Sequence, residues 1–195
     1  MPTVSLTSIA TVRMGATLRG RDATRPDPNG SCRLIQISDL DSDGTFRNED
    51  FTRIEPNETV NSSLYLRPGD ILFPNRGTRT TAAVITHTAE NILAGAQFFV
   101  LTRKSTEVIP EYLAWTLRTT EAARYFASRR KGTLVQTLQR FHLEEFPVPL
   151  PPLAVQATIL KIDDLARDAR EKEARLAALR ATHLEQSLLK AAHQV

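Results

Sequence analysis

The C-terminal end of the chain allows only one kind of regular structure. Neither glycine nor proline occurs from Ala154 to Val195, whereas the segment just before it, 146–153, contains four prolines. Prolines are excluded from a helix interior and from a central strand, so 146–153 is predicted to be an extended and stiff arm. The uninterrupted residues that follow predict a single helix of about 40 residues, about 60 Å long at 1.5 Å per residue.

Apolar residues on this predicted helix recur at intervals of three and four, which is typical of a coiled-coil seam with one phase slip near Glu173. The stripe consists of Val155, Ile159, Ile162, Ala166, Ala169, Leu176, Leu179, Leu184 and Leu188. A rod of this length cannot bury its stripe against one small domain. We therefore expect a second helix beside it, either folded back from a kink or supplied by a second chain. The alternative is a helix that docks along its own domain.

Residues 1–152 are predicted to form a separate, β-rich globular domain. Short apolar runs separated by turn residues predict strands at 33–37, 71–73, 81–86 and 97–102. Asp39–Gly44 is predicted to be a turn, with a return strand that begins at Thr45-Phe46. The fold class is therefore α+β, with a domain boundary between residues 152 and 153.

The segment from Pro110 to Gly132 changes to helical periodicity. Pro110 occupies a natural first-turn position, and Lys131-Gly132 is a plausible helix end. We predict one continuous helix over these residues.

The charge distribution is compatible with a nucleic-acid partner. The chain has a net charge of +3 and a pI near 9.3. The segment Gln97–Arg140 has eight basic and three acidic residues, whereas the C-terminal helix is nearly neutral. An excess of positive charge on the globular part permits nucleic-acid binding without establishing it.

Several classes of protein are disfavoured. The sequence contains no apolar run long enough for a transmembrane helix and no secretory signal, so we expect a cytoplasmic protein without membrane contact. Cys32 is the only cysteine, which excludes an internal disulfide and a cysteine-rich zinc site.

No catalytic motif is apparent. The sequence lacks a nucleophile elbow, a Walker loop and a dinucleotide fingerprint. The four histidines (His87, His142, His183 and His193) do not have the spacing of a zinc pair. We expect no catalytic residue, no cofactor and no metal; an enzyme with an unrecognised site is the alternative.

The alternating carboxylates Asp39, Asp41 and Asp43, followed by Gly44, are similar to the start of a calcium loop. The twelfth position of such a loop requires a bidentate glutamate, and Asp50 stands there. Because aspartate and glycine also favour turns, we interpret these residues as a hairpin turn.

Two polar segments are candidates for contact with DNA. Arginine pairs with guanine, asparagine pairs with adenine, and hydroxyls bind phosphates. The candidates in the first segment are Asn75, Arg76, Thr78, Arg79 and Thr80. The candidates in the second are Arg129, Arg130, Lys131, Thr133, Gln136, Thr137 and Arg140, with Lys104 and Arg124 expected to contact phosphates. The alternatives are an ordinary exposed loop, and cations that stabilise a helix C-terminus.

The order of these segments resembles the specificity subunits of type I restriction-modification systems. Leu66–Phe73 is similar to their Gly-Asp-Ile-Leu segment, and Ile109–Leu113 is similar to their helix entry. The segment from Gly132 to Leu143 also resembles them, and the most specific match is Phe146–Leu153 with Gln156 and Ile159, which resembles their domain-to-helix junction. Ala154-Val155 departs from the more polar pair found in many relatives.

The resemblance implies a non-catalytic subunit that reads double-stranded DNA. In this family each recognition domain reads one half of a bipartite target, and antiparallel helices space the two halves. Methyltransferase subunits dock on the spacer, and a translocating nuclease subunit can join.

This chain has one recognition domain and one helix where the family usually has two of each. It could be a natural half-subunit that forms a homodimer through Ala154–Gln194, which would dictate an inverted-repeat target with a central gap. It could also be an inactive remnant or a fragment. The alternative from another class is an interaction module that binds a methyltransferase without reading DNA.

Overall fold

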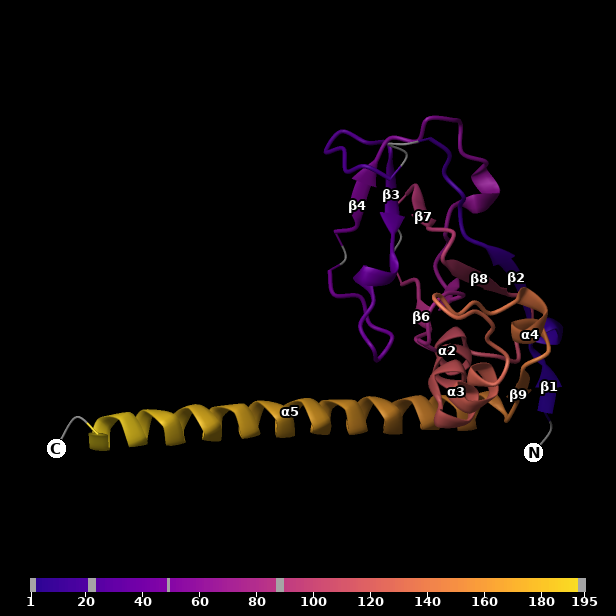
Figure 1. Cartoon of the computed structure of the whole chain (residues 1–195). Coiled ribbons are helices and arrows are strands. Elements are labelled where there is room, and N and C mark those ends of the chain that lie inside the picture. Colours follow the sequence, from indigo (N-terminus) through magenta and orange to yellow (C-terminus); the bar gives the residue numbers. More distant parts are fainter. Residues whose placement is uncertain (1–2, 21–23, 49, 87–89, 193–195) are drawn as a thin grey trace. The chain divides into compact units, whose positions relative to one another are not determined.

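The computed structural model describes residues 3–20, 24–48, 50–86 and 90–192 (Figure 1). The chain divides into two compact units, Met1–Gln156 and Ala157–Val195. The first unit combines small β-sheets with short helices, and the second continues a long helix that begins at Leu153. The predicted α+β class, with a β-rich domain followed by a long helix, is confirmed.

The central sheet has four antiparallel strands in the order β2-β8-β5-β6. They span β2 (Ala10–Met14), β8 (Phe98–Arg103), β5 (Ile71–Pro74) and β6 (Ala83–Val84). Phe98, Phe99, Val100 and Leu101 are all buried, as expected for an apolar strand with neighbours on both sides. Pro74 pairs with Phe98, so the chain leaves β5 at the end of the sheet where β8 begins.

A second sheet has the order β4-β3-β7, in which β3 (Cys32–Ile35) is central. β4 (Thr52–Ile54) is antiparallel to β3, and β7 (Ile92–Ala94) is parallel to it. The return strand predicted to begin at Thr45-Phe46 is limited to an isolated antiparallel bridge between Phe46 and Leu40. The strand that pairs with β3 starts later, at Thr52.

The predicted continuous helix is two helices, α2 (Pro110–Arg118) and α3 (Thr120–Ala127). Thr119 has extended backbone angles, which interrupt the predicted helix. Its hydroxyl accepts a hydrogen bond from the Ala122 backbone N–H at 3.2 Å. Threonine is a favourable N-cap residue, so this position ends one helix and starts the next. A short helix, α4 (Arg140–Glu144), follows.

The proline-rich arm forms an edge strand. β9 (Pro147–Pro149) pairs antiparallel with β1 (Thr3–Ser5), and α1 (Leu6–Ile9) follows β1. Val148 is buried between the two prolines and keeps the N–H group that they lack. A two-stranded sheet has no central strand, so prolines are tolerated there.

The helix α5 (Leu153–Ala192) is continuous over 40 residues. Its first turn belongs to the first unit, and Gln156 is fully buried there. The side-chain Oε1 of Gln156 accepts from the Ile109 N–H at 2.9 Å, and its Nε2 donates to the carbonyls of Glu107 and Pro151 at 2.7 and 2.8 Å. The glutamine of the junction motif therefore joins three separate points of the chain.

The leucines of the α5 stripe are exposed within the single chain, with 47% to 63% of Leu176, Leu179, Leu184 and Leu188 accessible. Among the described residues, no helix combines the length and the apolar character that crossing a membrane requires.

Candidate nucleic-acid interface

The two polar segments singled out from the sequence lie side by side. The 74–82 loop follows β5, and the 130–138 loop follows α3. The Gly77 N–H donates to the Gln136 carbonyl at 2.8 Å, and the Leu138 N–H donates to the Asn75 carbonyl at 2.8 Å. Arg76 and Thr137 form an antiparallel bridge between the loops. The sequence predicted each loop as a candidate, but not that they are hydrogen bonded to each other.

Arg130 fixes the 74–82 loop from inside. Its side chain is only 8% exposed, and its guanidinium donates to the carbonyls of Pro74, Gly77 and Arg79 at 3.4, 2.5 and 2.7 Å. Burial lowers the pKa of Arg130, but an arginine guanidinium is not deprotonated in proteins, so Arg130 keeps its charge. A buried cation that satisfies three carbonyls holds the loop in one conformation.

Asn75 has a similar role at the start of the loop. It is 5% exposed, and its amide group donates to the Ala96 carbonyl at 2.9 Å. Asn75 and Arg130 were both predicted to contact DNA. Both side chains are buried and donate to backbone carbonyls of the protein, so they support the loop conformation.

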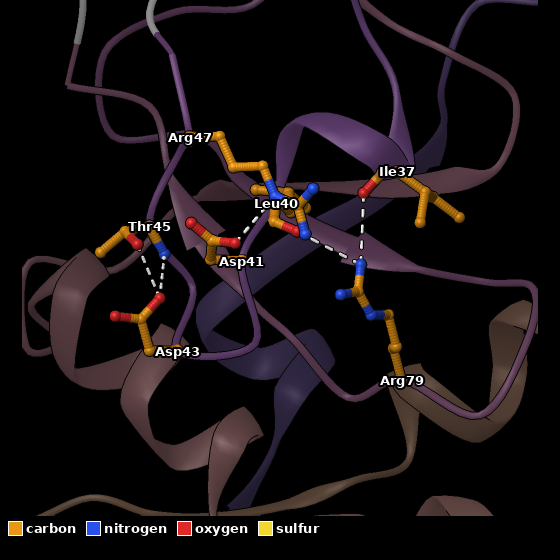
Figure 2. A network of polar contacts seen from close by, with 7 residues as sticks. All are labelled: Ile37, Leu40, Asp41, Asp43, Thr45, Arg47 and Arg79. Carbon is orange, nitrogen blue, oxygen red and sulfur yellow. Dashed lines mark hydrogen bonds and ion pairs between the residues drawn. The ribbon is translucent and has the colours of Figure 1, made fainter. Parts of the chain in front are cut away.

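A third segment, residues 37–47, packs against the 74–82 loop (Figure 2). Arg79 is half-buried, and its guanidinium donates to the carbonyls of Ile37 and Leu40 at 3.3 and 3.2 Å. Gly44 has a φ of +89°, and a Cβ atom there would lie 2.4 Å from the Ala82 carbonyl oxygen. Only glycine allows this close approach between the two segments.

The aspartates of this third segment form contacts within the turn that contains them. Asp41 pairs with Arg47 at 2.8 Å, and Asp43 accepts hydrogen bonds from the Thr45 N–H and hydroxyl at 3.0 and 2.6 Å. The predicted hairpin turn is confirmed, closed by the bridge between Leu40 and Phe46. Within the described ranges, no three His, Cys, Asp or Glu side chains gather as a metal site. His87 and His193 lie outside those ranges.

Most of the other candidates in the two loops face solvent. The exposed ones are Arg76, Thr78, Lys131, Thr133, Gln136 and Thr137, while Thr80 is half-buried. Arg124 is exposed on α3, and Arg140 is exposed at the start of α4, where it pairs with Glu144 at 3.2 Å. The loop pair therefore presents cations, hydroxyls and amides on a fixed backbone.

Arg129 and Lys104 are placed differently. The Arg129 guanidinium lies 3.6 Å from the centroid of the Tyr125 ring and donates to the Tyr125 carbonyl at 3.1 Å, which stabilises the end of α3. Lys104 follows β8, at the end of the sheet opposite to Pro74. Six strand residues separate the two ends, about 20 Å, so the structure does not bring Lys104 to the loops.

Two residues at the tip of the 130–138 loop were not identified as candidates from the sequence. Leu134 is 98% exposed and Val135 is 57% exposed. The only sequence signal was an apolar pair between polar residues in the run Gly132–Thr137. That signal is uninformative without knowledge that the segment forms a projecting loop.

The β-rich domain followed by a long helix is a fold that this chain shares with solved S subunits of type I restriction-modification systems. Comparison with solved structures finds this fold in the S subunit of M. genitalium, with a TM-score of 0.55 and 13% identity over 84% of this chain. The HsdS subunit of Thermoanaerobacter tengcongensis gives a TM-score of 0.60 and 19% identity over 86%.

A third match is a chain from a structural study of complex assembly and conformational transition in the type I R-M system. It gives a TM-score of 0.60 and 20% identity over 91% of this chain. This chain spans 39%, 37% and 43% of the lengths of the three solved chains. Protein-family models and curated proteins yield no match to the sequence. The resemblance found in the sequence is confirmed at the level of the fold.

Proposed function

We propose that this chain is a non-catalytic recognition subunit that reads double-stranded DNA and directs a partner methyltransferase to its target. The observation that supports this most directly is the pair of hydrogen-bonded loops, which present Arg76 and Lys131 to solvent on a fixed backbone. Exposed arginine can read guanine in the major groove, and lysine can neutralise a phosphate. The fold shared with S subunits agrees with this role.

We further propose that the long helix pairs with a second copy. Two copies related by a two-fold axis would read an inverted repeat with a central gap. The exposed leucines of α5 supply an apolar stripe for such pairing. In a cytoplasmic complex of this kind, the paired helices would also bind the methyltransferase, and a nuclease subunit could be added.

The DNA-reading role is tested by binding the full chain, alone and with its methyltransferase, to a pool of random duplexes. Binding should weaken with salt, the logarithm of affinity falling by about 0.9 for each phosphate neutralised per tenfold increase in salt. Arg76→Ala should relax the base preference at one position. Lys131→Ala should weaken binding to all duplexes alike and reduce the salt slope by about 0.9.

One result would contradict the proposed DNA-reading role. If the chain captured the methyltransferase but bound no duplex at any salt concentration, it would be an interaction module rather than a DNA reader.

A further inference from the structure

The tip of the 130–138 loop is apolar although the rest of the loop is polar. Leu134 is 98% exposed and Val135 is 57% exposed, with Thr133 and Gln136 on either side. A single exposed leucine is ordinary on a protein surface. This pair differs because exposed cations stand at the base of the same loop, where Arg76 and Lys131 each form a bridge with Thr137.

The tip rests on a rigid base. The Lys131 N–H donates to the Thr137 carbonyl at 3.0 Å, and the Thr137 N–H donates to the Lys131 carbonyl at 2.8 Å. Gly132 has a φ of +122°, and a Cβ atom there would lie 2.4 Å from the Val135 carbonyl oxygen. Lys131 and Thr137 are thus held together by two hydrogen bonds, which close a short loop of five residues between them. A short closed loop loses less conformational freedom on binding than an open segment of the same length.

The combination of charges and apolar side chains restricts the partner. The partner must offer negative charge to Lys131 and Arg76 and an apolar group to Leu134 of the same loop pair. Duplex DNA has both: phosphates line the grooves, and base edges carry the thymine methyl group. The faces of a partly opened base step are a second apolar surface, into which proteins insert leucine.

Building on the proposed function, we propose that Leu134, with Val135 beside it, is a specificity-determining contact to an apolar group of the DNA bases. It favours a target position that offers a thymine methyl group or an easily opened base step. The loop then reads DNA with two kinds of chemistry, cations for phosphates and guanine, and an apolar tip for the methyl group or base face.

The test uses the full chain and its selected duplex, synthesised with thymidine and with deoxyuridine, which lacks the methyl group. Leu134→Ser removes the apolar tip, and Leu134→Met keeps it. Loss of a contact the size of one methyl group should weaken binding about fourfold. Wild type and Leu134→Met should therefore prefer thymidine to deoxyuridine about fourfold, whereas Leu134→Ser should bind the two duplexes equally. The salt slope should be the same for all three proteins, because no phosphate contact changes.

A second readout distinguishes the two apolar surfaces. If Leu134 enters a base step, the fluorescence of 2-aminopurine placed at that step should increase when wild type or Leu134→Met binds, but not when Leu134→Ser binds. This increase should be the same for the thymidine and the deoxyuridine duplexes. Either result supports the proposal. Because the side chain is almost fully exposed, the melting temperature of Leu134→Ser should equal that of wild type.

Three results would overturn the proposal. If Leu134→Ser matches wild type in affinity, in its preference for thymidine and in the fluorescence of 2-aminopurine, the tip has no role in reading DNA. A steep salt dependence of wild-type binding would still support the proposed function. If Leu134→Ser keeps its DNA binding and loses the methyltransferase in a pull-down, the tip is a protein contact. If wild type binds no duplex, the proposed function and this inference both fail.

Discussion

Buried polar side chains decide the conformation of the candidate interface. Arg130 donates to three carbonyls of the 74–82 loop, and Asn75 joins that loop to Ala96. Neither side chain faces solvent, although both were predicted from the sequence to contact DNA. A residue list alone cannot separate a reading arginine from a supporting one, because burial depends on contacts between residues 51 to 56 positions apart.

Replacing Arg130 should therefore affect stability and recognition together. Arg130→Met keeps an unbranched, flexible apolar stem, removes the guanidinium group and leaves three carbonyls without this donor. We expect the free energy of unfolding to fall by about 2–3 kcal/mol, since hydrogen bonds to charged groups are worth about 1.5–3 kcal/mol. Urea unfolding measures this, with Arg124→Met as the control: this arginine is exposed on α3 and should cost no more than about 0.5 kcal/mol. Equal losses for the two variants would contradict the supporting role.

Gln156 gives a second prediction at this scale. Gln156→Ala removes three hydrogen bonds and leaves the Ile109 N–H without its acceptor. An unsatisfied buried group costs about 1–3 kcal/mol, so we expect a loss of at least about 2 kcal/mol in unfolding free energy. Gln186→Ala, in the exposed part of α5, should change stability by less than about 0.5 kcal/mol. The prediction fails if Gln156→Ala and Gln186→Ala lower the free energy of unfolding by the same amount.

At the scale of elements, local signals predicted the structure where one segment determines its own conformation. The strands β5 and β8, the start of α2 at Pro110 and the long helix all follow from apolar runs, prolines or their absence. The Leu40–Phe46 turn follows from its aspartates and glycine in the same way.

Where two distant segments determine the outcome, the sequence was not sufficient. The strand β7 was missed because it is three residues long and is stabilised by its parallel pairing with β3. The break at Thr119 was missed because the apolar periodicity continues through it, whereas the N-cap hydrogen bond that creates it is invisible to periodicity. The pairing of the two loops depends on tertiary contacts in the same way, so the sequence indicated the candidate residues and not their arrangement.

Two glycines in the loops offer a matched test of this arrangement. Gly132 and Gly77 both have positive φ, +122° and +78°. A Cβ atom at Gly77 would contact nothing within 4 Å, whereas one at Gly132 would lie 2.4 Å from the Val135 carbonyl. We expect Gly77→Ala to cost about 1 kcal/mol for the left-handed conformation alone. Gly132→Ala should cost more, because the clash adds about 1–3 kcal/mol of strain.

Hydrogen exchange of the Lys131 and Thr137 amides measures the difference locally. These amides should lose protection in Gly132→Ala and keep most of it in Gly77→Ala. Equal protection in both variants would show that the 130–138 loop is not held as described.

At the scale of the whole molecule, the α5 stripe makes the proposed homodimer testable. Leu176 and Leu184 are 47% and 60% exposed in the single chain. The double variant Leu176→Glu with Leu184→Glu places charge on the stripe and should shift the sedimenting species from a dimer to the 21.7 kDa chain. Ala178→Glu adds charge on the other side of the helix, at 100° per residue, and should leave the dimer intact. A wild-type chain that sediments as a monomer at all concentrations would rule out self-pairing.

If the two loops read DNA as proposed, the Arg130 contacts have a consequence for how the target could change. The arginine on one loop sets the backbone of the other, so a substitution in the 74–82 loop also shifts the platform on which the 130–138 loop rests. Single replacements chosen to alter one base preference should show strong epistasis with replacements in the partner loop. New specificities should therefore arise by exchange of both loops as a unit, and libraries that randomise the two together should yield more functional readers than libraries that vary either one.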